Sequence, residues 1–203
     1  MYRVILASES PRRKEIMEQM GIPFQAMGSS LAEVVEEKEP AAMVQALAAI
    51  KAKDIASKIA EAKDTAADMI IIGADTMVFF QENVLGKPKD KADAMRMLQM
   101  LSGGEHEVYT GVNIIIRPVQ GHMESISFAV CTKVLMRALT REQIENYVAT
   151  GEPMDKAGAY AIQGRFGIYI SEIHGDYYNI VGFPIAKIHE KLLEHGIDLL
   201  DLK

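Results

Sequence analysis

The sequence predicts an α/β protein with a mixed, twisted sheet and flanking helices. Strand-like and helical stretches alternate along the 203 residues, which is typical of this class. Residues 69–74 form a continuous apolar run, Met-Ile-Ile-Ile-Gly-Ala, that is typical of a strand buried on both faces. Two long strand-like stretches, 106–117 and 123–136, are joined by the turn 118–121. They predict a hairpin, so the sheet is mixed rather than purely parallel.

The residues before the buried run predict two strands and two helices. A strand is expected over residues 3–7 and a second, short one over 24–27. A helix is expected over 11–20, because Gly-Ile-Pro follows it, and a long alanine-rich helix is expected over 41–67. The long helix carries apolar residues at helical spacing, which predict its buried face: Val44, Leu47, Ala48, Ile55 and Ile59.

The residues after the buried run predict further elements of both kinds. They are a hairpin that ends at Val84, a turn at 86–88, a helix over 92–101, the strand pair described above, a helix from Thr140 to Val148, a strand over 168–173 and a helix over 184–195. Thr140 is expected to cap its helix, because a threonine hydroxyl accepts hydrogen bonds from first-turn amides. The stretch 151–167 is rich in glycine and charge and is expected to be a loop.

Composition excludes several classes of protein. Hydrophobic residues make up 49% and charged residues 25% of the chain, as in ordinary folded proteins. The net charge of −6 argues against broad nucleic-acid binding.

No apolar run approaches the ~20 residues that span a bilayer, and no signal peptide is visible, so a cytoplasmic protein without membrane contact is expected. No linker divides the chain, so one domain, residues 1–203, is expected. Cys131, the only cysteine, is expected to be buried.

The junction between the first strand and the first helix is the most informative feature of the chain. Ser8, Ser10, Pro11, Arg12 and Arg13 lie together there. Pro11 suits the first helical position and Ser10 suits the cap, so first-turn amides, hydroxyls and guanidinium groups would gather at one turn. That combination predicts a phosphate cradle. The alternative is a capped surface helix with solvated arginines.

Asp75 and Thr76 follow the most buried strand. Ligands of α/β folds bind beyond the carboxyl ends of such strands, where a carboxylate can hold a divalent cation or accept a proton from water. A capping or turn aspartate is the alternative, and position alone does not separate the two. A nucleophilic aspartate of the haloacid-dehalogenase type is disfavoured, because Met77 stands where that chemistry needs a second carboxylate.

Two further stretches carry candidate binding residues. Lys87 lies between Gly86 and Pro88, which restrict the backbone and would hold the lysine for a phosphate contact. An exposed turn lysine is the alternative, and Lys51 on the long helix would by itself be part of a solvated face. Gln163, in the polar tract 151–164, has donors and an acceptor that could read a nucleobase; an amide that only stabilises the loop is the alternative. No histidine pair has metal-ligand spacing, and neither a P-loop nor a dinucleotide-binding motif occurs.

These segments, in this order, make the chain resemble the Maf family of nucleoside triphosphate pyrophosphatases. The matching segments are 6–13, 51–52, 73–76, 85–88, 101–103, 106–112, 151–164 and 179–184. The resemblance implies a Maf/Ham1-like fold with two lobes around a central cleft. It also implies hydrolysis of a triphosphate between the α and β phosphates, which gives a monophosphate and pyrophosphate, with Mg²⁺ or Mn²⁺ as cofactor. A homodimer is a further expectation from the family.

The resemblance also assigns roles to residues. Asp75 matches the catalytic carboxylate, which acts as general base. The residues that match the positions marking the dTTP/UTP branch are Arg12, Thr76 and Gln163. The residues that match the polar lining of the phosphate site are Ser8, Arg13, Lys51 and Lys87. Glu33 and Asp75 are the expected metal ligands, although Ala32-Glu33 stands where the family usually has an Asp-Glu pair.

A second function stays open at this point. A nucleotide-sensing binding protein that acts in cell-division control would keep the cationic cradle, and its hydrolysis would be incidental. Pyrophosphate release from dTTP or UTP with Mg²⁺ separates the two functions. An RNA-binding module is disfavoured, because the chain is acidic and has no patch that combines basic and aromatic residues.

Overall fold

The computed structural model describes residues 2–62 and 66–202, which form a mixed sheet with flanking helices. The strands are β1 (Tyr2–Leu6), β2 (Gln25–Ala26), β3 (Asp68–Phe80), β4 (Asn83–Leu85), β5 (Glu105–Arg117), β6 (Glu124–Met136) and β7 (Ile170–His174). The α-helices are α1 (Pro11–Gln19), α2 (Pro40–Glu61), α3 (Lys91–Leu101), α4 (Arg141–Ala149), α5 (Tyr177–Val181) and α6 (Ile185–Leu193). Short 3₁₀ helices are η1 (Glu152–Asp155), η2 (Ala157–Ala159), η3 (Arg165–Tyr169) and η4 (Leu199–Asp201).

The strand pairing confirms the predicted mixed sheet. The described strands pair in the order β2-β1-β3-β5-β6-β7, and β4 pairs with β3. β1 is parallel to β2 and β3, whereas β4 is antiparallel to β3 and β7 is antiparallel to β6. The expected long helix is α2, but it ends at Glu61: residues 62, 66 and 67 of the predicted range 41–67 are not helical, and residues 63–65 lie outside the described residues.

The chain divides into two compact units. Unit 1 comprises Met1–Asp75, Thr110–Ala129 and Gly182–Lys203, and unit 2 comprises Thr76–Tyr109 and Val130–Val181. The two lobes that the resemblance implies agree with this division. The central cleft and the single domain over residues 1–203 stay predictions.

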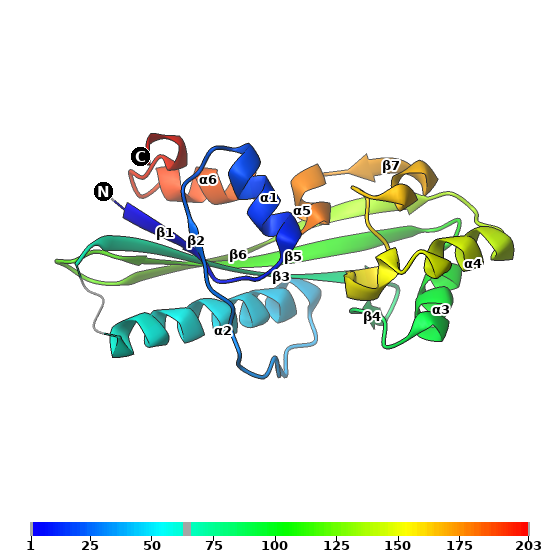
Figure 1. Ribbon diagram of the computed structural model, residues 1–203, viewed down its shortest axis with the longest axis horizontal. Coiled ribbons are helices and arrows are strands. Elements are labelled where there is room, and N and C mark those ends of the chain that lie inside the picture. Colours follow the sequence, from blue (N-terminus) through cyan, green and yellow to red (C-terminus); the bar gives the residue numbers. More distant parts are fainter. Residues whose placement is uncertain (1, 63–65, 203) are drawn as a thin grey trace. The chain divides into compact units, whose positions relative to one another are not determined.

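Unit 1 is built around the parallel strands β1 and β3. The helix α2 covers one face of these strands, and α1 and α6 cover the other (Figure 1). The predicted apolar ridge of α2 is buried, with Ile55 and Ile59 packed against Ile5 and Ile71. The apolar run 69–74 is fully buried at its side chains, as expected for a strand covered on both faces.

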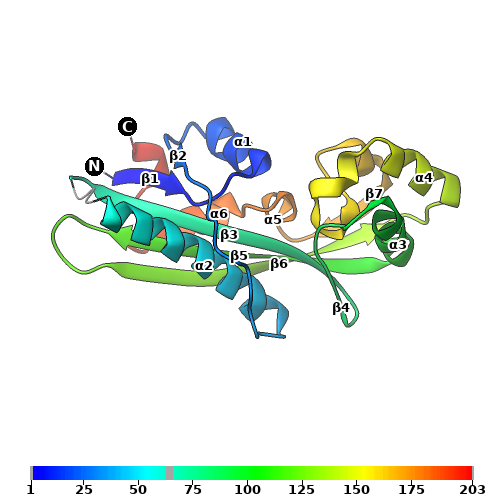
Figure 2. The ribbon, with the colours of Figure 1, turned by 60° about the horizontal axis from the view of Figure 1, so that its bottom comes forward.

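Unit 2 has its own core beneath two helices. Figure 2 shows α3 and α4 side by side, and buried residues of both helices belong to one apolar cluster. Phe166 lies at the centre of an aromatic group, with ring centroids 4.8 Å from Tyr147 and 5.3 Å from Tyr160. Thr140 caps α4 as predicted and forms a capping box with Gln143.

The expected burial of Cys131 is wrong. β6 alternates between exposed and buried residues, with Thr132 and Val134 buried and Cys131 and Lys133 exposed. Successive side chains of a strand point to opposite faces, so the register of β6 places Cys131 outward.

Among the described residues, no helix has both the length and the apolar character needed to cross a bilayer. The cytoplasmic location stays a prediction.

His106 makes the stability of the protein depend on pH. Its side chain is buried, its Nε2 lies 2.8 Å from the Tyr160 hydroxyl, and burial lowers its pKa to about 4. The unfolded chain therefore binds a proton between pH 6.5 and 4 that the folded chain does not bind. As pH falls from 7 to 4, this residue is expected to remove up to about 3 kcal/mol from the free energy of unfolding.

Urea unfolding at pH 7 and at pH 4.5 checks this expectation, with His106→Phe as the comparison. The phenyl ring fills the same space and cannot take up a proton. The variant should therefore lose less stability on acidification than the wild type. Equal losses in the two proteins would contradict the assignment to His106.

Candidate active site

The buried carboxylate of Asp75 is at the centre of the candidate site. Asp75 follows the apolar part of β3 and is 8% exposed. The Lys51 ammonium donates a hydrogen bond to Asp75 Oδ1 and lies 3.1 Å from Glu33 Oε1. The Lys51 side chain is only 13% exposed, so the expectation of a solvated lysine, made from helix pattern alone, is wrong. One ammonium thus pairs with both predicted metal-binding carboxylates.

A glycine in β3 places Lys51 beside Asp75. A Cβ atom on Gly73 would lie 2.4 Å from the Ala48 carbonyl oxygen and 2.9 Å from the Ala52 amide nitrogen. The backbone of α2 therefore packs directly on β3, which a larger residue would prevent. Because Lys51 lies between these two contact residues, its side chain starts close to the strand and reaches Asp75.

Arg13 organises the turn that precedes α1. Its Nε donates a 2.8 Å hydrogen bond to the Gly182 carbonyl oxygen, and its Nη1 donates a 3.1 Å bond to Ser8 Oγ. The Ser10 amide also donates to Ser8 Oγ, at 3.2 Å. A serine hydroxyl has two acceptor sites and one donor, so the Ser8 O–H remains to donate to an anion. Ser10 occupies the N-cap position, but its side chain makes no capping hydrogen bond with the first turn of α1. The hydrogen bond from the backbone amide of Ser10 to Ser8 Oγ is the contact that ties this residue to the turn.

The predicted residues of unit 1 form one electrostatic group. Burial lowers the pKa of Arg13, the charges of Asp75 and Glu33 oppose that shift, and Arg12 adds to it. A guanidinium group remains protonated at neutral pH even so. The structure therefore brings together the six predicted residues of this unit: Ser8, Arg12, Arg13, Glu33, Lys51 and Asp75.

The other three predicted residues belong to unit 2. Thr76 follows Asp75 directly and is half-buried, whereas Lys87 and Gln163 are exposed. The Gly158 amide donates to the Gly86 carbonyl oxygen at 3.1 Å, which joins the turn of Lys87 to the tract of Gln163. The tract is partly 3₁₀-helical rather than a plain loop.

Glu152 supports the end of that tract. Its carboxylate accepts hydrogen bonds from the Tyr147 hydroxyl and from the Arg165 amide, at 3.0 and 3.3 Å. A Cβ atom on Gly164 would lie 2.0 Å from Glu152 Oε1, so a larger residue immediately after Gln163 would displace the Glu152 carboxylate. This role of Glu152 was not predicted from the sequence.

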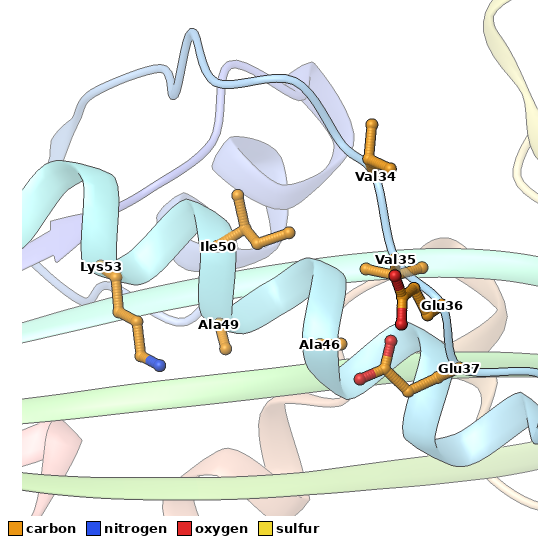
Figure 3. Close-up of a pocket in the computed structure, with 8 residues that line it drawn as sticks. All are labelled: Val34, Val35, Glu36, Glu37, Ala46, Ala49, Ile50 and Lys53. Carbon is orange, nitrogen blue, oxygen red and sulfur yellow. The ribbon is translucent and has the colours of Figure 1, made fainter.

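A groove borders the segment that carries Glu33. Figure 3 shows the residues that line it, from that segment and from the facing side of α2. They are Val34, Val35, Glu36, Glu37, Ala46, Ala49, Ile50 and Lys53. Its volume is about 390 Å³, so this part of the segment is not closely packed on α2.

The donor set for a metal ion is small. Within residues 2–62 and 66–202, no group of three or more histidine, cysteine, aspartate or glutamate side chains is placed to hold a metal. Glu33 and Asp75 supply two carboxylates around one positive charge, that of Lys51. Mg²⁺ is commonly held by one or two carboxylates together with phosphate oxygens and water, so the residues present fit such an ion.

Comparison with known proteins decides the family. The profile described as Maf-like protein matches residues 3–195, nearly the whole chain. This chain belongs to the Maf family. The Maf chain is 48% identical over 200 residues to a dTTP/UTP pyrophosphatase of Lachnoclostridium phytofermentans, with 98% of each chain covered. It is 45% identical over 205 residues to a dTTP/UTP pyrophosphatase of Agathobacter rectalis, with 98% of this chain and 100% of that one covered.

Solved structures similar to this Maf protein include a HAM1 protein from Coxiella burnetii. The sequence identity is 12%, the TM-score is 0.47, and the similarity covers 80% of this chain and 89% of that chain.

Two features of the site in this Maf protein were missed by sequence reasoning. The first is the Gly182 carbonyl oxygen, which binds Arg13; Gly182 has a φ of +107°, which favours glycine. The second is the pairing of Lys51 with two carboxylates. Each joins residues far apart in the chain, and a single sequence contains no signal that connects them.

Proposed function

We propose that this Maf protein hydrolyses dTTP and UTP to the monophosphate and pyrophosphate. The observation that carries the proposal is a buried carboxylate, Asp75, in one group with Lys51, Arg12 and Arg13. The family and the names of the two relatives support the same activity. A buried base next to several cations suits attack of water on a phosphorus atom that carries anionic oxygens.

In the proposed reaction, Asp75 accepts a proton from the attacking water. Arg12 and the Ser8 hydroxyl donate hydrogen bonds to phosphate oxygens, and Arg13 holds Ser8 in the orientation that this requires. A divalent cation, Mg²⁺ or Mn²⁺, would be held by Glu33 and Asp75 and would neutralise charge on the leaving pyrophosphate. Thr76, Lys87 and Gln163 are the proposed contacts in unit 2, and a homodimer stays a prediction.

A nucleotide panel with pyrophosphate detection tests the proposal. The protein is incubated with each common ribo- and deoxyribonucleoside triphosphate and Mg²⁺, with and without an excess of EDTA. We expect pyrophosphate from dTTP and UTP above all, and none once the chelator removes the metal. Tight binding without pyrophosphate, or release of orthophosphate in its place, would contradict the proposal; the first result would favour a nucleotide-sensing protein.

A further inference from the structure

Lys51 lies where a cation would lie between the two carboxylates. Its Nζ donates to Asp75 and lies 3.1 Å from Glu33 Oε1. We propose that the Lys51 ammonium is an exchangeable internal counter-ion: a divalent cation displaces it from Glu33 and Asp75, and the released ammonium then binds a phosphate of the substrate. This inference rests on the proposed function for the identity of the substrate.

Exchange follows from the chemistry of the three side chains. A divalent cation bound by both Glu33 and Asp75 would lie between the two carboxylates, where the Lys51 ammonium now lies, and two cations so close together repel each other strongly. Lysine has a compact charge on a flexible stem of four carbons, so Nζ can swing aside without movement of α2. A phosphate oxygen then replaces the carboxylates as its acceptor.

The exchange also reverses the local charge. Lys51, Glu33 and Asp75 together carry one net negative charge, which offsets part of the positive charge of Arg12 and Arg13. A divalent cation added to the three groups leaves one net positive charge. The exchange thus adds to the attraction for phosphate that Arg12 and Arg13 already supply in the free protein.

Glu33 is the carboxylate that is free to adjust. Its side chain is 50% exposed, whereas that of Asp75 is 11% exposed and lies on the central strand β3. The next residue, Val34, is 77% exposed, and the groove of about 390 Å³ separates this segment from α2. Movement of Glu33 toward a metal ion therefore disturbs little apolar packing.

Metal binding to the protein without nucleotide tests the exchange. Free Mn²⁺ is measured by electron paramagnetic resonance during titration of the wild type and of Lys51→Met. Because Mn²⁺ no longer competes with two charge-assisted contacts, we expect the variant to bind Mn²⁺ about tenfold more tightly or more. Lys53→Met, two residues away on the same helix and exposed, is the matched control and should bind as the wild type does.

Two further measurements identify the groups involved. Adding Glu33→Gln to Lys51→Met should abolish the gain in Mn²⁺ affinity. In the presence of saturating Mn²⁺, inorganic pyrophosphate should bind Lys51→Met about tenfold more weakly than wild type, because its ammonium partner is missing. Thermal unfolding verifies that each variant is folded, and Lys51→Gln replaces Lys51→Met if the methionine variant does not fold.

Equal or weaker Mn²⁺ binding by a folded Lys51 variant would overturn the inference. A gain in affinity that persists with Glu33→Gln would also overturn it, because the metal would then lie elsewhere. The proposed function can fail independently of this inference. A wild-type protein that releases no pyrophosphate from dTTP can still show the exchange, because neither binding measurement uses a nucleotide.

Discussion

Asp75→Asn is expected to lower pyrophosphate release from dTTP and UTP by about 10²–10⁴-fold. The amide has nearly the shape of the carboxylate, but it does not accept a proton readily and has no negative charge to attract a metal ion. The folded structure should persist, because the amide oxygen can still accept a hydrogen bond from Lys51. Initial rates at saturating nucleotide give the change in turnover, and calorimetric titration should show that part of the UTP binding is retained.

Asp54→Asn is the matched control for that experiment. Asp54 is also a buried aspartate of unit 1, at 8% exposure, and it pairs with a lysine, Lys58, at 2.8 Å. It is not one of the predicted site residues, and an asparagine at this position can still accept the hydrogen bond from the Ser30 amide, so the variant should release pyrophosphate at close to the wild-type rate. Turnover by Asp75→Asn equal to that of Asp54→Asn would remove the role of general base from Asp75.

Gly111→Ala is expected to lower the free energy of unfolding by about 3 kcal/mol or more. A Cβ atom on Gly111 in β5 would lie 2.2 Å from both the carbonyl carbon and the carbonyl oxygen of Val44 in α2. Overfilling a packed core costs about 1–3 kcal/mol when side chains can adjust. Here the obstacle is backbone, so α2 itself must move away from the sheet. Urea unfolding monitored by circular dichroism measures the loss.

Gly86→Ala serves as the control for added bulk at a glycine. No atom lies within 4 Å of a Cβ at that position, and its backbone does not have a positive φ. Its unfolding curve should lie close to that of the wild type. A Gly111→Ala protein as stable as Gly86→Ala would mean that α2 does not pack on β5 as closely as described.

Displacement of α2 should also disturb the candidate site, because the same helix carries Lys51. The contacts of α2 with Gly73 and with Gly111 hold its backbone against β3 and β5. At a temperature where Gly111→Ala remains folded, its turnover should therefore fall as well, although Gly111 is not one of the predicted substrate-binding residues.

Local pattern was enough to predict most of the secondary structure. The run of apolar residues at 69–74 predicted a strand buried on both faces, and the helical spacing of Val44 and Ile55 predicted the buried face of α2. These predictions succeeded because they depend on periods of two and 3.6 residues, which neighbouring positions report by themselves. Cys131 shows the limit: its apolar surroundings suggested burial, but the register of β6 placed it outward.

The candidate site was likewise predictable only where its residues are close in sequence. Ser8, Arg12 and Arg13 lie on one turn, so their proximity follows from a short stretch of sequence. The sequence does not reveal which of these side chains contact one another, because Arg13 is oriented by a carbonyl oxygen 169 positions later in the chain.

The order of the main strands and helices and the residue types suited to phosphate chemistry can thus be read along the chain, since each depends on residues close in sequence. The pairing of Lys51 with Asp75 and Glu33, the anchoring of Arg13 by Gly182 and the glycine contacts beneath α2 arose only when distant segments folded together. Such contacts depend on how helices and strands approach one another in space, and a single linear sequence does not specify those distances.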